Sequence, residues 1–434
     1  PGKILSFDKY LSSEERSYWD INEVAESSLK NQYNFSYEEI IKKTENILLS
    51  STESHLVSDT PIGSFLSGGI DSTLITSLMS EVSKDKINTF SIGFEGEKYN
   101  EAIYAKKIAN HLKTDHTELY ISPKEAIEFI KLIPKHFDEP FSDSSNIPTY
   151  LISKMTRRYV KVALSGDGGD ELFCGYNRYL LANQFKGLFE MPYLMKLSLI
   201  SPINLLSEDK WNYFFNRLNI KSLPNELGSK LYKLKKIIGK DKDGFYQDLV
   251  SIWNNPYEIV NWESDRKNSF SIEKLKTITP NFIDRMQLID FLTYLPDDIL
   301  TKVDRATMAV SLEARVPLLD HRVVEFSWKM KQNLKIKKNS TKWILRQILY
   351  KYVPKNLIER PKMGFGVPLS KWLRNELRDW AEYLLSEKVF EKHSLLKRDP
   401  IIIKWKQHLS GKYNWQYQIW NILMLHAWAE EYNK

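Results

Sequence analysis

The stretch FLSGGIDS at residues 65–72 decides the fold, because it joins a strand end to a helix start through a tight glycine turn. Residues 62–66 are a short apolar run suited to a buried parallel strand, and residues 72–82 repeat apolar side chains at helical spacing. Adjacent glycines let the backbone approach a ligand closely, and the free N–H groups of a helix start favour an anion. The stretch therefore predicts a phosphate-binding turn.

The side chains of this turn indicate which kind of phosphate site it is. Ser67 and Ser72 add hydroxyl donors, whereas Asp71 adds a carboxylate that would repel phosphates unless a hard cation such as Mg²⁺ lay between them. The spacing matches neither the GxxxxGK[ST] loop nor the GxGxxG loop. A magnesium-nucleotide site is the hypothesis that follows. An ordinary strand-turn-helix junction would explain the glycines but not the serines or the aspartate.

Composition is that of a globular protein with a sizeable core. Of 434 residues, 42% are hydrophobic and 27% charged, so two or more compact units are expected. The net charge of +7 comes from lysines scattered among acids, which argues against nucleic-acid binding. Cys174 is the single cysteine, which excludes a disulfide framework and a cysteine-based zinc site. Without a secretory segment or a membrane-spanning apolar run, we expect a cytoplasmic protein with no membrane partner.

Strands and helices alternate over the first 200 residues. Strands are predicted at residues 62–66, 87–94, 118–121 and 160–164, and helices at 37–58, 72–82, 100–113, 123–137 and the second half of 143–159. This alternation is typical of βαβ units, and so of a parallel twisted sheet flanked by helices. Residues 1–34 are polar and predict a linker or lead-in strand. From about residue 200 onward the pattern is mainly helical, so the predicted class is α/β with a large C-terminal helical portion.

A second glycine-rich loop, SGDGGDE at residues 165–171, follows the last of these strands. In parallel sheets ligands collect beyond the carboxyl ends of the strands, where this loop and the first turn would meet. Its acids Asp167, Asp170 and Glu171 would repel one another unless a cation or a basic partner gathered them. Asp170 is therefore the candidate for a second magnesium ligand opposite Asp71, although one of the three acids would also serve as a helix cap.

Together with motifs further along the chain, these loops resemble the synthetase domain of glutamine-dependent asparagine synthetases, in the PP-loop ATP pyrophosphatase superfamily. The further motifs are LTKVDRATMAVSLEARVPLLD at 300–320, TKWILR at 341–346, RPKMGFGVP at 360–368 and NWQYQIW at 414–420. The resemblance implies a Rossmann-like α/β core at residues 35–200 and a mainly helical part at 201–434 that completes the synthetase domain. Residues 1–34 would then be a linker remnant from an N-terminal glutaminase domain that this sequence does not contain.

What the resemblance implies is an AMP-forming amide ligase. A carboxylate, with L-aspartate as the leading candidate, would attack the α-phosphorus of ATP and release pyrophosphate. Ammonia from glutamine would then displace AMP from the adenylate to give the amide, asparagine. The first turn would hold the departing pyrophosphate, while Mg²⁺ on Asp71 and Asp170 would neutralise its charge. The implied cofactors are ATP and Mg²⁺, and the implied partner is a glutaminase domain in cis or in trans.

The resemblance also carries residue roles. Lys342 matches the family's lysine that faces the α-phosphate, although by composition alone it would be an ordinary solvated lysine. Asp167 stands where better-known members have a glutamate that assists formation and aminolysis of the adenylate. Glu171 would face the ammonia entry or cap its helix. The implied nucleotide-binding positions are Leu66, Ser67, Gly68, Gly69, Asp71, Ser72, Ile92, Ser165 and Gly166.

Three alternatives stay open at this point. Residues 141–150, FSDSSNIPTY, lie where acceptor contacts are expected and are similar to a divergent bacterial branch, so a sugar-acid or peptide carboxylate could replace aspartate. A cyclase of the β-lactam or lasso-peptide type would join an internal amine to its own adenylate. A non-catalytic nucleotide-binding subunit is the third. The oligomeric state also stays open, a homodimer included, and Cys174 is predicted to be an inert thiol.

Overall fold

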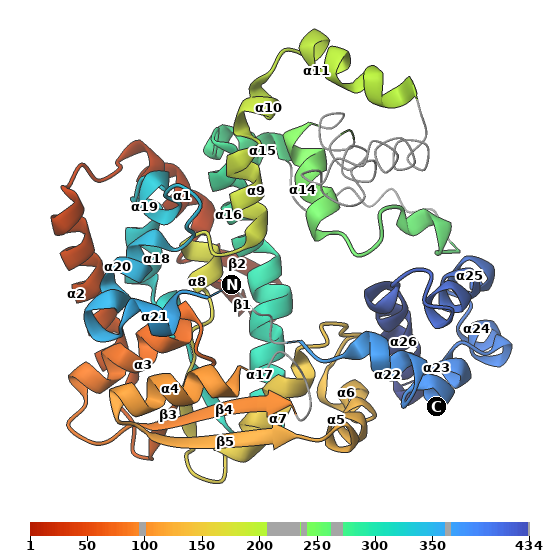
Figure 1. The fold of residues 1–434 in the computed structure, drawn as a ribbon, viewed down its shortest axis with the longest axis horizontal. Coiled ribbons are helices and arrows are strands. Elements are labelled where there is room, and N and C mark those ends of the chain that lie inside the picture. The colour runs from red at the N-terminus through yellow and green to blue at the C-terminus, as the bar shows by residue number, and fades with distance from the viewer. Residues whose placement is uncertain (95–100, 206–234, 236–240, 262–271, 361–365, 433–434) are drawn as a thin grey trace, which may run out of the picture.

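The computed structural model describes residues 1–94, 101–205, 235, 241–261, 272–360 and 366–432 (Figure 1). Within these ranges five strands form one sheet in the order β5–β4–β3–β6–β7, and every neighbouring pair is parallel. The strands are β3 (Ile62–Phe65), β4 (Asn88–Phe94), β5 (Asp115–Ile121), β6 (Val162–Leu164) and β7 (Glu313–Arg315). The predicted parallel sheet flanked by helices is confirmed, and the chain is an α/β protein.

Helices surround the sheet and dominate the C-terminal half (Figure 1). Up to residue 205 they are α1 (Ile21–Lys30), α2 (Tyr37–His55), α3 (Ile70–Val82), α4 (Ala102–Leu112), α5 (Pro123–Ile130), α6 (Ile133–His136), α7 (Asn146–Thr156), α8 (Gly169–Leu172), α9 (Asn177–Gln184), α10 (Lys186–Glu190), α11 (Tyr193–Ile200) and η1 (Pro202–Leu205). Up to residue 335 they are α14 (Lys242–Val250), η2 (Pro256–Glu258), α15 (Ile272–Ile278), α16 (Phe282–Leu292), the π-helical η3 (Leu295–Leu300), α17 (Thr301–Met308), η4 (Pro317–Leu319), α18 (His321–Trp328) and α19 (Gln332–Lys335). The remainder are α20 (Trp343–Tyr352), α21 (Lys355–Ile358), α22 (Leu369–Arg374), α23 (Arg378–Leu384), α24 (Glu387–His393), α25 (Arg398–Leu409) and α26 (Gln416–Tyr432). In the ranges that the structure describes, no helix combines the length and the apolar character needed to cross a membrane.

Two apolar clusters pack against the sheet. Successive residues of a strand point to opposite faces, and Ala163 and Leu164 of β6 accordingly enter different clusters. One cluster joins α2, α3 and α4 to α18 and α20, and the other joins α5, α6 and α7 to the C-terminal helices. The C-terminal half is thus built into the same core as the sheet.

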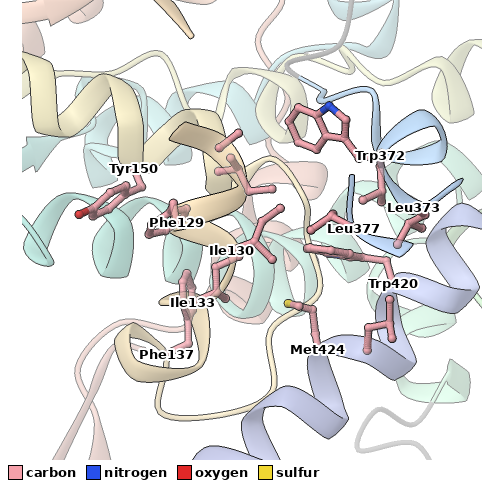
Figure 2. Close-up of a cluster of buried hydrophobic side chains, with 14 of the residues drawn as sticks. Phe129, Ile130, Ile133, Phe137, Tyr150, Trp372, Leu373, Leu377, Trp420 and Met424 are labelled. Atoms are coloured by element: carbon pink, nitrogen blue, oxygen red, sulfur yellow. The ribbon is translucent and has the colours of Figure 1, made fainter. Parts of the chain in front are cut away.

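The second cluster is rich in aromatic side chains. Figure 2 shows Ile133 and Phe137, from α6 and the residue after it, on the side of the cluster that faces Trp420 and Met424 of α26, and Phe129 of α5 beside Tyr150. Trp420 is fully buried. Because Phe and Trp side chains bury about 150–250 Å² each, this contact stabilises the attachment of the C-terminal helices to the α/β part.

The helix predicted over residues 123–137 is two helices in the structure. Ser122 caps the first of them, α5, through a capping box with Glu125, so the predicted cap is confirmed. α5 ends at Ile130, and α6 begins at Ile133 with Pro134 in its first turn. Proline lacks an N–H group and is tolerated in a first turn but not inside a helix, which explains the break.

Two parts of the described fold differ from the sequence-based prediction, the fifth strand and residues 1–34. The fifth strand, β7, is only three residues long and carries Glu313 and Arg315, so no apolar run marks it. Residues 1–34, expected as a linker or lead-in strand, form a hairpin of β1 (Lys3–Phe7) and β2 (Ser13–Ser17) followed by α1. The face of α1 that packs on the core consists of Ile21, Val24, Ala25, Ser28 and Leu29, so an apolar repeat at helical spacing was present in the sequence and was overlooked.

We predict that α1, unlike the hairpin, contributes to the stability of the domain. Ile21 is 5% exposed whereas Ile4 is 42% exposed, so the two isoleucines form a matched pair. Ile21→Ala should lower the free energy of unfolding by about 2–5 kcal/mol, and Ile4→Ala should change it by less than about 0.5 kcal/mol. Urea unfolding followed by circular dichroism measures both. Equal, small effects would mean that residues 21–30 are only a linker.

Candidate active site

The turn between β3 and α3 is closed by its own serines. Gly68 has a φ of +74°, a conformation that side chains other than glycine rarely adopt. The hydroxyl oxygens of Ser67 and Ser72 lie 3.0 Å apart, and the Ser67 N–H donates to Ser72 Oγ over 3.2 Å. Gly69, the residue before α3, provides no side-chain cap. The turn therefore has the geometry of an anion site at a helix N-terminus.

The loop between β6 and α8 packs directly onto this turn. A Cβ added at Gly166 would lie 2.7 Å from the Ser72 backbone nitrogen, and one added at Gly169 would lie 2.5 Å from Asp71 Oδ1. Both distances are shorter than real Cβ contacts. Glycine at these two positions is therefore what allows the loops to meet.

Lys342 joins the two loops electrostatically. Its Nζ makes an ion pair with Asp71 Oδ2 and a second, of 2.8 Å, with Asp170 Oδ1. Gly175 leaves room for this side chain, because a Cβ there would lie 1.9 Å from both Lys342 Cε and Asp170 Oδ1. Burial acts to lower the pKa of Lys342, but Asp170 and Asp71 outweigh it and raise the pKa above the usual lysine value. The buried side chain is therefore an ammonium at neutral pH.

The backbone of Lys342 is unusual as well. The residue precedes α20 with a φ of +52°, in the left-handed region that non-glycine residues rarely occupy. Its N–H donates to the Phe173 carbonyl over 3.2 Å, which ties it to the end of the second loop. Such conformations persist where the surrounding structure enforces them, often at functional sites.

The carboxylates around Lys342 have the chemistry of a Mg²⁺ site. Asp71 and Asp170 are both within ion-pair distance of one Nζ, so they converge on a single position, and Mg²⁺ prefers carboxylate oxygens. Among the described residues no group of three or more His, Cys, Asp or Glu side chains could hold a metal. A Mg²⁺ ion here would take two carboxylates, with phosphate and water oxygens completing the set, as is usual for this ion.

Glu171, the neighbour of Asp170 in the second loop, is buried as well. The side chain is 2% exposed and its Oε1 accepts a 2.5 Å hydrogen bond from the Tyr176 hydroxyl. Burial, and then repulsion from Asp170, raises the pKa of Glu171 to about 7. α8 begins after Gly168, which has no side chain to act as a cap, and Asp170 and Glu171 lie in its first turn.

A second lysine lies at the other end of the site. Lys302 Nζ donates to Asp143 Oδ2 and to Ser145 Oγ, each over 2.9 Å, and the lysine is 9% exposed. Burial acts to lower the pKa of Lys302, but the surrounding carboxylates raise it above the usual value. These carboxylates are Asp143, Asp167 and Asp298. Lys302 thus links the segment predicted to contact the acceptor to the second glycine-rich loop.

One cavity of about 530 Å³ contains every predicted site residue among its lining side chains. The predicted residues are Leu66, Ser67, Gly68, Gly69, Asp71, Ser72, Ile92, Ser165, Gly166, Asp167, Asp170, Glu171 and Lys342. Asp143, Ser145 and Thr149 of the 141–150 segment line it as well. Asp167 accepts a hydrogen bond from Ser165 Oγ at this wall. The structure therefore brings together the two loops, the predicted lysine and the predicted acceptor segment.

Several lining residues were not singled out from the sequence. They are Glu101, Tyr176, Tyr294, Lys302, Arg346 and Arg360. Lys302, Arg346 and Arg360 belong to the motifs at 300–320, 341–346 and 360–368, so basic residues within the motifs were the available signal. Cys174 does not line the cavity. It is fully buried and burial raises its pKa, which agrees with the predicted inert thiol.

Comparison with known proteins agrees with this geometry. The asparagine synthase family matches residues 43–430. Asparagine synthetase [glutamine-hydrolyzing] 1 of Bacillus subtilis is 32% identical over 90% of this chain and 59% of its own length. Asparagine synthetase [glutamine-hydrolyzing] 3 of the same organism is 25% identical over all of this chain and 65% of its own length. Asparagine synthetase B of Escherichia coli is 32% identical over 33% of this chain and 28% of its own length.

The chain spans about three fifths of the length of the first of these relatives. The match nevertheless includes both glycine-rich loops, Lys302, Lys342 and Arg360, because it runs through nearly the whole chain. Fold, site and sequence similarity agree, and the chain belongs to the asparagine synthase family.

Proposed function

We propose that this chain is the synthetase part of an ATP-dependent amide ligase. It would activate a carboxylate as its adenylate, release pyrophosphate and transfer the acyl group to ammonia, with L-aspartate as the carboxylate and glutamine as the source of ammonia. The observation that carries the proposal is the convergence of Asp71, Asp170 and Lys342 beside an anion-binding turn. The names of the relatives support it, although those proteins are longer. ATP and reduced thiols occur together in the cytoplasm, where we place the protein.

Charge stabilisation is what the site residues can provide. The turn from Ser67 to Ser72 would bind the departing pyrophosphate through N–H and hydroxyl donors. Mg²⁺ bound at Asp71 and Asp170 would supply further neutralisation of the leaving group. Lys342 has a raised pKa and keeps its proton, so it suits stabilisation of the pentavalent α-phosphorus rather than proton transfer.

The acceptor would bind at the Lys302 end of the cavity. Lys302 offers a cation to a carboxylate, and Ser145 and Thr149 offer hydroxyl groups. Asp167 belongs to the second glycine-rich loop and interacts electrostatically with Lys302, which suits the assisting role proposed for it at the adenylate. Glu171, with its pKa of about 7, has the chemistry to receive a proton from incoming ammonium. A glutaminase domain, in cis or in trans, would deliver that ammonia.

The bond of ATP that is cut tests the proposed reaction. With ATP, Mg²⁺, L-aspartate and ammonium chloride, the protein should form AMP and pyrophosphate, because the carboxylate attacks the α-phosphorus. Phosphorus NMR distinguishes these products from ADP and phosphate, which would refute the proposal. Pyrophosphate release with a bound amine-containing acid and no added ammonia would indicate a cyclase. ATP binding without turnover on aspartate, sugar acids or peptides would indicate a non-catalytic subunit.

Asp71 is the carboxylate of the first turn that would hold the cation. Asp71→Asn should lower pyrophosphate release by about 10²–10³-fold, because it removes one of the two carboxylates that would hold the cation at the leaving group. Asp85→Asn, which changes an exposed aspartate after α3, should leave the rate unchanged. The thermal unfolding midpoint reports whether the variant is folded. A folded Asp71→Asn protein with normal activity would remove Asp71 from the mechanism.

Asp298, a carboxylate near Lys302, should make the stability of the protein depend on pH. Burial, and then repulsion from Asp143, raises the pKa of Asp298 to about 7 from an ordinary value of 3.8. The unfolded chain releases this proton first, so the aspartate lowers the free energy of unfolding progressively between about pH 4 and pH 7. Asp298→Asn should therefore be more stable than the parent by about 2–4 kcal/mol at pH 8 and equal to it near pH 4.

Urea unfolding at the two pH values measures this difference. The exposed neighbour Asp297 provides the matched control, and Asp297→Asn should show no gain at pH 8. An Asp298→Asn protein that is no more stable than the parent at pH 8 would contradict the strained environment inferred for this carboxylate.

A further inference from the structure

Arg360 lies against the start of the phosphate-binding turn, although no role has been given to it so far. Its Nη2 donates to the Ser67 carbonyl over 3.3 Å. A Cβ added at Gly68 would lie 3.3 Å from the same nitrogen, so the guanidinium stands beside that glycine. Arg360 therefore lines the cavity at the first residues of the turn, whereas Lys342 meets Asp71 at its far end.

The guanidinium also packs against the ring of Tyr104. Its central carbon lies 4.2 Å from the centre of the Tyr104 ring on α4, a cation–π distance. Glu101 is the carboxylate that pairs with it, and the oxygen-to-nitrogen distance of 4.0 Å is long for an ion pair. Nη1 is buried and has no hydrogen-bond partner among the residues that the structure describes. The side chain thus keeps a donor and most of its charge for another group.

Lys342 and Arg360 both contact the turn, but they differ in how closely carboxylates match their charge. Lys342 contacts two carboxylates at short range, so the trio of Lys342, Asp71 and Asp170 carries a net negative charge. Such a group needs additional positive charge before it can bind pyrophosphate. Arg360, with one carboxylate at 4.0 Å, is the cation at the turn that can contribute it.

Arg346 couples the position of Arg360 to that of Lys342. Its Nη1 pairs with Glu359 over 2.6 Å, and its Nε donates to the Thr341 carbonyl over 2.9 Å. Glu359 precedes Arg360, and Thr341 precedes Lys342. The Arg346 guanidinium therefore connects the backbone segments that carry Arg360 and Lys342. These contacts fix the position of Arg360 relative to Lys342.

We propose that Arg360 binds the β- and γ-phosphates of ATP and the pyrophosphate that they become. The inference rests on the proposed function, since it assigns a contact to the leaving group of that reaction. Guanidinium groups match phosphate oxygens with two parallel N–H donors; Nη2 of Arg360 is at the turn, and Nη1 of the same group has no partner among the described residues. In this role Arg360 would contact the ligand itself. A purely structural role would consist only of its hydrogen bond to the Ser67 carbonyl.

Calorimetric titration of inorganic pyrophosphate, with Mg²⁺ present, tests the contact. Arg360→Gln should weaken pyrophosphate binding by about 10–100-fold, the loss expected for a charge-assisted hydrogen bond. Arg360→Lys should recover most of the affinity, because the charge is kept. Glutamine keeps a neutral donor for the Ser67 carbonyl, so a residue that only held the turn would be replaced better by Gln than by Lys. AMP, which lacks both outer phosphates, should bind all three proteins equally.

Arg378→Gln is the matched control. Arg378 is a half-exposed arginine of α23 that pairs with Glu382 and lies outside the cavity, so this variant makes the same change in net charge and should bind pyrophosphate like the parent. Thermal unfolding checks the fold of each protein, and Arg360→Lys carries the test if the Gln variant does not fold.

Several results would overturn the inference. They are unchanged pyrophosphate affinity in folded Arg360→Gln, equal loss of AMP and pyrophosphate binding, better rescue by Gln than by Lys, or no pyrophosphate binding by the parent. Pyrophosphate binding tests this inference, whereas formation of AMP tests the proposed function. A parent that binds pyrophosphate through Arg360 but forms no AMP with any carboxylate would refute the amide ligase and leave the phosphate contact standing.

Discussion

The arrangement of the site depends on one buried ammonium, that of Lys342, paired with Asp71 from the first loop and Asp170 from the second. Two carboxylates brought together in a cavity wall would repel each other strongly, and a buried lysine alone would lose its proton. Each side therefore stabilises the charge of the other. The ion pairs hold the two loops in a geometry that suits a triphosphate with its cation. The carboxylates can face the cation, and the ammonium can face a phosphate.

The fold creates this meeting point from residues that are far apart in the chain. β3 and β6 are parallel neighbours, so their carboxyl ends open at the same edge of the sheet. Gly166, Gly169 and Gly175 then remove the side chains that would keep the loops and Lys342 apart. Lys342 itself comes from the turn before α20, which packs on α3 in the same apolar cluster. Packing of the C-terminal half thus determines the position of the Lys342 ammonium.

Much of this was predictable from the sequence, for a physical reason. The glycine turns, the carboxylates and the strand–helix alternation are local patterns, and they indicated β3, α3, β6 and the loop residues directly. Lys342 needed the family motif, since nothing local distinguishes it from other lysines. Lys302, Arg346 and Arg360 act through contacts with residues more than ten positions away, as in the Lys302 bond to Asp143, so no local pattern reveals them. The edge strand β7 has no apolar run that could reveal it, whereas α1 has an apolar face at helical spacing that was overlooked.

The central claim is that both loops serve one cation beside the triphosphate. Anomalous diffraction from crystals of the protein soaked with Mn²⁺ and a non-hydrolysable ATP analogue tests it most directly, since manganese replaces magnesium at carboxylate and phosphate sites. We expect a manganese peak in contact with the carboxylates of both Asp71 and Asp170, and phosphate density on the Ser67–Ser72 turn. A manganese peak that touches neither carboxylate, with the triphosphate bound away from the turn, would contradict the account.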